Sequence, residues 1–426
     1  MKIKIDKSSI LNIIILFTII LLVIILPNKL SSLKILGIYN IMISILMVIR
    51  HHNNKPYAFL MGIIALINIS YSSSVCINTL ENVRTWQFSL YYLPENIINV
   101  KSYSLFITFL LLSFKKCDTN AKLNIYNYNP IIYLGCYIIL IYTLVFGIDK
   151  STISTYVSNS NVLYEYAIVI YVLAWCFSGD KKLSKAFLLF FSLLYCLQGL
   201  MYGDRSSAFP MIIVNILLLF QNKIDLKKVL IIGICGIMFG NFIDIYRNDS
   251  NITINTFNEI ANRGLNVNTI SFSSYAGTQI IRYSERNNIK ERNIHFMRYV
   301  TSLFKGRTSK LALSDAAKEN GFENKGGGMT SSYFYFWFGY LGAIFGGIIV
   351  GKTINSIYKK SNNQLYCIIS ILISAFSIRW ILYYPSAFFR TSIIIPMLGY
   401  VAFKIFHNIV GKKPIFLGLA NKGEAL

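Results

Sequence analysis

Arginines at three places in this chain have surroundings that suit the binding of an anion. Arg205 lies beside Asp204 in a tight turn between two apolar segments, where its planar, always charged guanidinium would match the oxygens of a phosphate. Arg379 and Arg390 flank the short segment Trp380–Phe389, and together with Arg205 they would form a cationic cavity. Simpler interpretations exist, because Asp204 can neutralise Arg205 at a helix start and arginines at the ends of apolar segments often only reach lipid headgroups.

The one long polar segment, Arg247–Thr330, holds seven arginines. Arg282 and Arg298 belong to a cluster that is interleaved with the acidic residues Glu285 and Glu291. A solvated helical face with salt bridges is the ordinary explanation of such a cluster. One or two arginines that point inward would instead fit a lipid that carries phosphate.

General acid–base chemistry in the same segment would fall to His295 or Glu285. His295 is the single histidine of the segment, and Glu291, Asn293 and Arg298 lie close enough in sequence to tune it as a proton acceptor. A single histidine in a polar loop is more often without a chemical role. The segment contains no cysteine, and no Cys or His spacing in the chain is typical of a zinc site, so we expect neither a metal nor another cofactor.

A membrane-embedded scaffold must position these residues. Hydrophobic residues make up 54% of the 426 positions and charged residues 14%, whereas a soluble protein carries about a quarter charged residues. Each spanning helix requires about 20 mostly apolar residues. We predict spans at Ile10–Leu26, Ile35–Ile49, Tyr57–Ile77, Ile97–Phe114, Ile131–Ile148, Val162–Phe177, Ala186–Tyr202, Ser207–Phe220, Val229–Tyr246, Ser331–Gly351, Leu365–Tyr384 and Phe388–Phe406.

Lysine and arginine alternate from one connecting segment to the next as the positive-inside rule requires. The N-terminal segment, with Lys2, Lys4 and Lys7, and the C-terminal tail both fall on the basic side. We therefore predict cytoplasmic termini and place the long segment outside, because long loops cross the membrane largely regardless of charge. The net charge of +23 then reflects topology and attraction to anionic membrane lipids, and we expect no nucleic acid as a partner.

The predicted fold is an all-α polytopic membrane protein with about 12 transmembrane helices and one large outer loop. Residues 1–246 would hold the first nine spans, residues 247–330 the loop, and residues 331–426 the last three spans and the cytoplasmic tail. Apolar residues at helical spacing after Ile254 and over Phe296–Phe304 predict two amphipathic helices within the loop. Such helices are typical of segments that lie on a membrane surface.

Glycines mark the return of the chain from the loop into the membrane. The run Gly326–Gly328 precedes a predicted span and lacks the strand-loop-helix context of a phosphate-binding loop, so we expect a hinge. The next span carries Gly342 and Gly346, then Gly347 and Gly351, at the four-residue spacing that lets helices approach closely. We expect both pairs to serve helix packing.

Short motifs give the chain a resemblance to the O-antigen polymerase family, the oligosaccharide repeat unit polymerases. The turn Gly203–Arg205 opens an outer helix with Gly-x-Arg, and the exit from the long loop combines Gly326–Met329 with the serine pair Ser331–Ser332. An aromatic Phe-Gly-x-x-Gly step, Phe338–Gly342, follows. Family members often carry a glutamate shortly before this step, where this chain has Tyr333–Trp337, so no acidic role is transferred there.

The resemblance implies an enzyme that joins undecaprenyl-diphosphate-linked glycan repeat units at the periplasmic face of a bacterial inner membrane. The growing glycan would leave its lipid diphosphate and be captured by a hydroxyl of the incoming unit, without a metal. A base near that hydroxyl is required, and His295 and Glu285 are the candidates. The resemblance also allows a chain-length regulator as a partner. The candidates for binding the diphosphate are Arg205, Arg298, Arg379 and Arg390, with Arg247 and Arg282 behind them.

Three other functions fit parts of the pattern. An O-antigen ligase is similar in plan and moves glycan from a lipid diphosphate onto a lipid A core. A polysaccharide flippase or another transporter would also have about 12 spans, but transporters usually combine short loops with internal repeats, and the sequence shows no repeat. A membrane scaffold without enzymatic activity would not need arginines at the outer ends of its spans.

Overall fold

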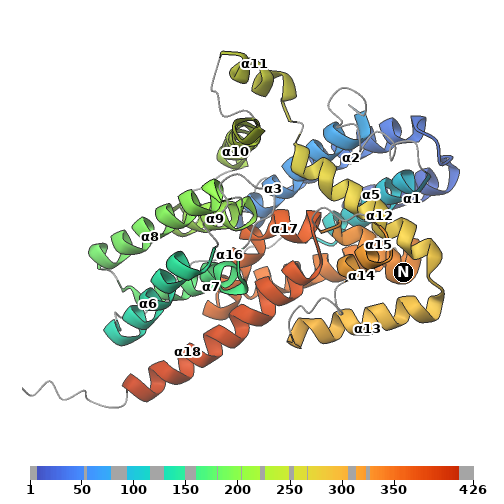
Figure 1. Cartoon of the computed structure of the whole chain (residues 1–426). Coiled ribbons are helices and arrows are strands. Elements are labelled where there is room, and N and C mark those ends of the chain that lie inside the picture. The colour runs from blue at the N-terminus through green and yellow to red at the C-terminus, as the bar shows by residue number, and fades with distance from the viewer. Residues whose placement is uncertain are drawn as a thin grey trace, which may run out of the picture.

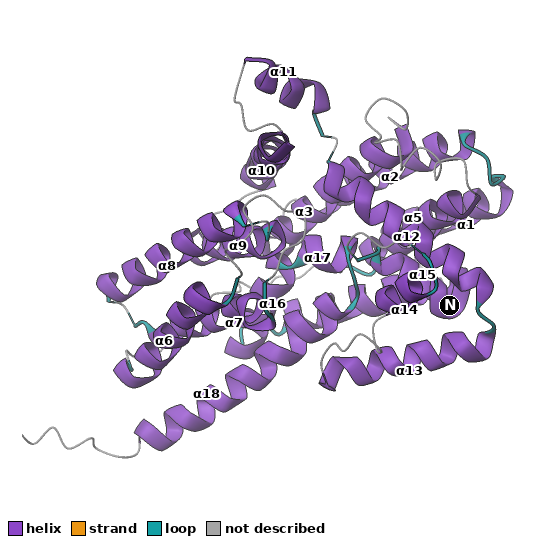
Figure 2. Cartoon of the chain, viewed as in Figure 1, coloured by secondary structure: helices purple, strands orange, loops and turns teal. Residues whose placement is uncertain are grey.

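The computed structural model describes residues 7–51, 55–77, 94–115, 129–148, 160–179, 181–202, 204–220, 226–248, 254–265, 267–305, 313–322 and 327–411. These residues are helical apart from short connections and one isolated antiparallel bridge between Ile148 and Ser160 (Figure 2). Figure 1 shows α6 to α9, α16 and α18 gathered on one side, and α1, α2, α5, α12, α13 and α15 on the other.

In chain order the helices are α1 (Lys7–Ile25), α2 (Ser31–His51), α3 (Lys55–Tyr71), the π-helix η1 (Ser72–Ile77), α5 (Pro94–Leu112), α6 (Pro130–Phe146), α7 (Val162–Phe177), α8 (Lys182–Met201), α9 (Arg205–Phe220) and α10 (Leu226–Asn248). They continue with α11 (Ile254–Arg263), α12 (Asn268–Arg286), α13 (Ile289–Lys305), α14 (Leu313–Glu319), α15 (Thr330–Lys359), α16 (Gln364–Ala375), α17 (Ser377–Leu382), the π-helix η4 (Ala387–Ile394) and α18 (Ile395–Gly411).

The chain is a helical membrane protein. Six stretches of the described residues are long and apolar enough to cross a membrane: Ser31–His51, Ala58–Ile77, Lys182–Met201, Lys227–Ile245, Thr330–Lys359 and Ala387–Asn408. The apolar parts of α1, α6, α7, α9 and α16 are shorter. Helices therefore lie where the apolar runs predict them, and α11 and α13 lie where amphipathic helices are predicted.

α5 is polar for a helix that is surrounded by apolar neighbours, and this polarity explains its central place. It packs against α15, α12, α2 and α1, and its side chains Asn99, Ser104 and Thr108 are buried. Hydrocarbon offers no hydrogen-bonding partner, so each of these groups must find one within the protein. Neighbouring helices supply them: Asn40 Nδ2 on α2, for example, donates to Ser104 Oγ over 2.9 Å.

α12 lies inside the bundle although its sequence, rich in Ser, Thr and Gln, contains no long apolar run. Asn99 on α5 donates through Nδ2 to the backbone oxygen of Ser274 on α12 over 3.0 Å. The same residue accepts a hydrogen bond of 2.6 Å from Ser332 Oγ on α15. Asn99 thus joins three helices, and part of the predicted outer loop is buried between two of them.

α15 bends sharply near its start at Phe338 and Gly339, whose backbone conformations are not helical. Gly339 has φ +63° and ψ −151°, a conformation that residues with a side chain rarely adopt. The turn places the backbone and ring of Phe334 directly against Gly342 and Gly346, so this glycine pair packs on its own helix start. The pair Gly347 and Gly351, by contrast, contacts the backbone of α5, as the four-residue spacing predicts.

A methyl group added at Gly277 of α12 is expected to destabilise the fold. Its Cβ would lie 2.6 Å from Ser332 Oγ and 3.0 Å from Asn99 Oδ1, so α12 must move away from α5, at a cost of about 1–3 kcal/mol. The matched control is Gly236→Ala, because the space around Gly236 on α10 is open. In detergent, Gly277→Ala should lower the thermal unfolding midpoint and Gly236→Ala should not; equal midpoints would contradict the packing described.

Candidate functional site: Arg379 and Arg390

Arg379 lies inside the bundle. The predicted span Leu365–Tyr384 is interrupted at Phe376, where α16 ends and α17 begins, and only 5% of Arg379 is exposed. Its Nη2 donates to Glu165 Oε1 over 2.6 Å and to the Tyr384 hydroxyl over 2.9 Å. The simpler interpretation of Arg379, an arginine that only reaches lipid headgroups, is therefore wrong.

Glu165 reaches Arg379 from the first turn of α7. Asn161 caps this helix, since its side chain accepts a hydrogen bond of 3.0 Å from the backbone N–H of Tyr164. An acidic residue at a helix start is also stabilised by the unpaired backbone N–H groups there. The Glu165 side chain remains 29% exposed.

Arg390 approaches the same region from η4. Its guanidinium lies over the ring of Tyr166, 5.7 Å from the centroid, and both Arg379 and Arg390 act electrostatically on the Tyr166 hydroxyl. Turns of π-helix are frequent at functional sites because they interrupt regular packing. We call Arg379, Arg390, Glu165, Tyr166 and Tyr384 the paired-arginine site.

Two buried donors of the paired-arginine site have no hydrogen-bond partner among the described residues. They are Arg379 Nη1 and Arg390 Nε. A buried donor without a partner costs about 1–3 kcal/mol, and more when the group is charged. Proteins rarely retain such groups without a reason. Anionic oxygens are the natural acceptors for such donors, and hydrogen bonds between charged groups are the strongest of their kind.

The start of α9 lies close to this site. Asp204 acts electrostatically on Arg379, while its own oxygens accept from the hydroxyls of Ser206 at 2.6 Å and of Ser207 at 2.7 Å. With the backbone N–H of Ser207, these bonds cap α9. Arg205 follows directly as the first residue of α9, so the structure brings its backbone near the arginine pair; its side chain lies outside the described part.

Three other predicted residues lie elsewhere or are not described. The side chain of Arg247, at the end of α10, is outside the described part of the chain. Arg282 lies on α12, where its Nε is 3.8 Å from Glu95 Oε1 at the start of α5. Glu285 lies one turn further along α12, and partial burial together with the nearby charge of Glu95 raises its pKa, against the effect of Arg282 and Arg292. We call Glu95, Arg282, Glu285 and Arg292 the Glu95 cluster.

His295 lies on the inner face of α13. Its Nε2 is 3.5 Å from the Tyr283 hydroxyl. Its ring packs nearly perpendicular to the ring of Phe336, with 5.5 Å between the ring centroids. Burial lowers the pKa of His295 below its ordinary value, the positive charge of Arg298 lowers it further, and Glu291 opposes both. The imidazole is therefore neutral at pH 7 and can accept a proton, in a largely aromatic environment.

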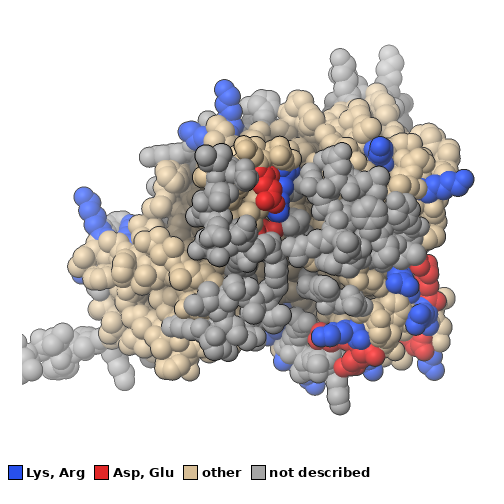
Figure 3. All heavy atoms as spheres, turned by 45° about the horizontal axis from the view of Figure 1, so that its top comes forward, with Lys and Arg blue, Asp and Glu red and all other residues tan. Residues whose placement is uncertain are grey.

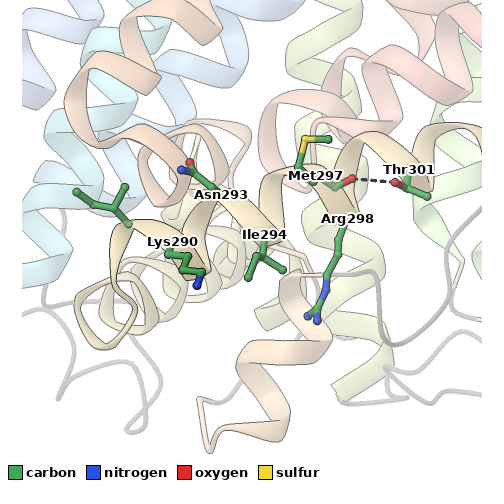
Figure 4. Close-up of a pocket in the computed structure, with 7 residues that line it drawn as sticks. Lys290, Asn293, Ile294, Met297, Arg298 and Thr301 are labelled. Carbon is green, nitrogen blue, oxygen red and sulfur yellow. Dashed lines mark hydrogen bonds between the residues drawn. The ribbon is translucent and has the colours of Figure 1, made fainter.

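Arg298 lies on the exposed side of the same helix. Figure 4 shows it beside a shallow hollow that is also lined by Lys290, Ile294, Met297 and Thr301. In Figure 3 most of the acidic side chains on the visible face gather at the side where α12 and α13 lie, mixed with basic ones. In the described residues, no hydrogen bond or ion pair joins Arg298, His295 or Glu285 to the paired-arginine site, so the predicted residues fall into separate groups.

Two acidic residues of these groups were missed by the reasoning from sequence. Glu165 lies within a predicted span, and Glu95 lies just before another. A rare acidic residue at the edge of an apolar segment is by itself a signal of function, and this signal was available for both. The sequence gives no signal for their partners, since Glu165 and Arg379, for example, are 214 positions apart in the chain.

Within the described residues, no three His, Cys, Asp or Glu side chains come together in the way that a metal site requires. Comparison with family models, with curated proteins and with solved structures finds no match to this chain. The arrangement of its own residues therefore carries the functional argument.

His295 is expected to titrate below pH 6.5, because burial and Arg298 both disfavour the imidazolium form. The rate of its acylation by diethyl pyrocarbonate, followed by peptide mass spectrometry against pH, measures this pKa. Arg298→Gln should raise the value toward the ordinary range by removing a positive charge. A pKa above the ordinary value in the wild type, or a fall in Arg298→Gln, would refute the described environment.

Proposed function

We propose that this chain is a membrane glycosyltransferase that polymerises glycan repeat units carried on undecaprenyl diphosphate. The observation that supports this most is that Arg379 and Arg390 each hold a buried donor without a partner among the described residues. A lipid diphosphate is an anion with many oxygens on an apolar tail, so its headgroup suits two arginines at the edge of a membrane-embedded bundle. The motifs around Arg205, Gly326–Met329 and Phe338–Gly342 support the same substrate class.

The two arginines would serve the reaction by stabilising the leaving group. When the bond between the anomeric carbon and the diphosphate breaks, negative charge grows on the diphosphate oxygens. Fixed cationic donors in a poorly hydrated site stabilise such charge strongly, because they need no rearrangement at the moment of reaction. Arg205, which begins α9 beside Asp204, is proposed as the third contact, and Arg298, Arg282 and Arg247 as more distant ones.

The proposed topology has 12 spans with cytoplasmic termini and a periplasmic segment over residues 247–330. It places the connections near Asp204, Gly327 and Tyr384 on the periplasmic side, together with the paired-arginine site. Contacts in the described part support a common location, since Gly327 packs directly on Tyr383 and Arg379 binds Tyr384. The proposed location is thus the inner membrane of a bacterium, with the site open to substrates delivered to its outer face.

In the proposed reaction, the region around α12 and α13 would bind the glycan, and the paired-arginine site would bind the lipid diphosphate. Of the two predicted bases, Glu285 lies on α12 within the Glu95 cluster, and His295 lies on the neighbouring helix α13. Arg298 lies on the exposed side of α13. Carboxylates and neutral imidazole are groups that hydrogen-bond sugar hydroxyls well. We propose that this region holds the glycan of one of the two substrates, and that a chain-length regulator would act from the same side.

Arg390→Lys is expected to abolish long-chain polysaccharide. Lysine keeps the positive charge but lacks the planar guanidinium. It also lacks the Nε–H group, which in Arg390 has no hydrogen-bond partner among the described residues. The control is Arg286→Lys, because Arg286 is exposed and lies over the Phe322 ring at 4.7 Å, remote from the paired-arginine site. A strain that lacks the gene is complemented with each variant, and its surface polysaccharide is resolved on a gel.

The wild type and Arg286→Lys should restore a ladder of long chains, and Arg390→Lys should leave lipid A core with a single repeat unit. If deletion of the gene removes even the single-repeat band, the chain is a ligase or a flippase instead. If it leaves the ladder unchanged, the proposed function is wrong.

Arg205→Ala and Arg205→Lys should both give the same collapse to a single repeat unit, since the proposed role requires the bidentate fork of the guanidinium and charge alone is not enough. Membrane abundance of each variant, measured on immunoblots, is the control for folding. Ladders of normal length in both variants would remove Arg205 from the site while leaving the arginine pair untouched.

A further inference from the structure

We infer that Glu165 is the base of the proposed reaction, held by Arg379 until a lipid diphosphate takes its place. This inference rests on the proposed function. Glu165 was not among the candidates predicted from the sequence. In this inference the proton of the acceptor hydroxyl is accepted within the paired-arginine site, and not by the Glu95 cluster or by His295.

The Glu165 carboxylate lies beside the proposed contacts to the leaving group. Its Oε1 lies 2.6 Å from Arg379 Nη2, next to the two donors proposed to hold the leaving group. A base must come within hydrogen-bond distance of the hydroxyl that attacks, and that hydroxyl must approach the anomeric carbon attached to the diphosphate. Base and leaving-group contacts therefore have to be neighbours, as Glu165 and Arg379 are.

Glu165 also has one carboxylate oxygen that can accept a proton. No described residue donates a hydrogen bond to its Oε2, and the side chain is 29% exposed. Asp204 is the other carboxylate near Arg379, but hydroxyls of Ser206 and Ser207 bind both of its oxygens. Tyr166, Tyr195 and Tyr384 also lie near this ion pair, and a neutral phenol is not a base at neutral pH.

Arg379 has more donors than Glu165 uses. Its Nη2 is bound to Glu165 and Tyr384, whereas Nη1 is buried without a partner among the described residues. In the proposed exchange, a diphosphate oxygen binds Nη1 and a second oxygen replaces Glu165 at Nη2. The exchange transfers Arg379 from carboxylate to diphosphate, and it releases Glu165 only when the donor substrate is present.

The chemical step then balances without a co-reactant. The oxygen of the acceptor hydroxyl forms a bond to the anomeric carbon of the donor glycan. The bond from that carbon to the diphosphate oxygen breaks, and its electron pair leaves with the diphosphate, which Arg379 and Arg390 stabilise. The hydroxyl proton moves to the Glu165 carboxylate and is lost to water before the next cycle.

An alternative is that Glu165 only neutralises a buried arginine. The two roles differ in what they require of substrate binding. If Glu165 competes with the diphosphate, Glu165→Gln should bind undecaprenyl diphosphate at least as tightly as the wild type, because a neutral amide is a weaker competitor for Arg379. If Glu165 only supports the fold, the same variant should lose stability and binding together.

The experiment uses the full chain in lipid nanodiscs, with wild type, Glu165→Gln, Glu165→Asp and Glu259→Gln. Glu259 is the matched control, since it forms an equally short ion pair of 2.6 Å with Arg263 on α11, away from the paired-arginine site. Binding is measured with undecaprenyl diphosphate itself, transfer with a lipid-linked repeat unit, and folding by the thermal unfolding midpoint.

Glu165→Gln is expected to retain binding and to lose transfer by on the order of 100-fold or more, the usual contribution of a general base. Glu165→Asp should retain part of the transfer, because it keeps a carboxylate, and Glu259→Gln should equal the wild type. Transfer at the wild-type rate in Glu165→Gln, or a parallel loss of binding and of the unfolding midpoint, would overturn the inference. Absence of transfer in the wild type itself would instead refute the proposed function.

Discussion

The requirement that buried polar groups be satisfied without water organises this bundle. α5 buries amides, hydroxyls and a lysine along its length, and it can be stable in a membrane only if other helices cover it. Asn99 meets the requirement by binding both α12 and α15. Lys101 does so by donating to Leu26 O at 2.6 Å and to Asn28 Oδ1 at 3.0 Å, between α1 and α2. The central packing of the molecule is thus a consequence of its polar residues, with apolar surface left for lipid.

The paired-arginine site follows the same rule incompletely. Arg379 is buried and compensated by Glu165 and Tyr384, which makes a cation tolerable within the bundle. Yet Nη1 of Arg379 and Nε of Arg390 lack partners in the described part, as do Asn68 Oδ1, Tyr103 Oη and Trp337 Nε1; the two arginine donors differ in that they belong to charged groups. A site that is ready for an anion before the anion arrives has this property, because donors fixed in advance need no reorganisation on binding.

The described end of the loop that returns the chain into the bundle packs closely on two helical segments. Gly328 packs on Ile280 of α12, while Gly327, with φ +99°, packs on Tyr383. Neither position has room for a side chain, and Gly327 also has a backbone conformation that favours glycine. The predicted hinge is therefore a closely packed connection. Diphosphate chemistry at the paired-arginine site and glycan contacts at the Glu95 cluster would match the two ends of a lipid-linked substrate.

Sequence alone determined the class of the protein and the places of most helices, because apolar runs and their interruptions are local properties of the chain. It also pointed to Arg379 and Arg390, since charge beside apolar segments is equally local. It gave no signal for the burial of α12, whose Ser and Thr residues become membrane-compatible only against Asn99. It likewise could not pair Glu165 with Arg379, 214 positions away, or separate Glu285 and His295 from the arginines. Tertiary structure decided these points, because the role of a buried polar group depends on the residue that binds it, and that residue can lie far away in the sequence.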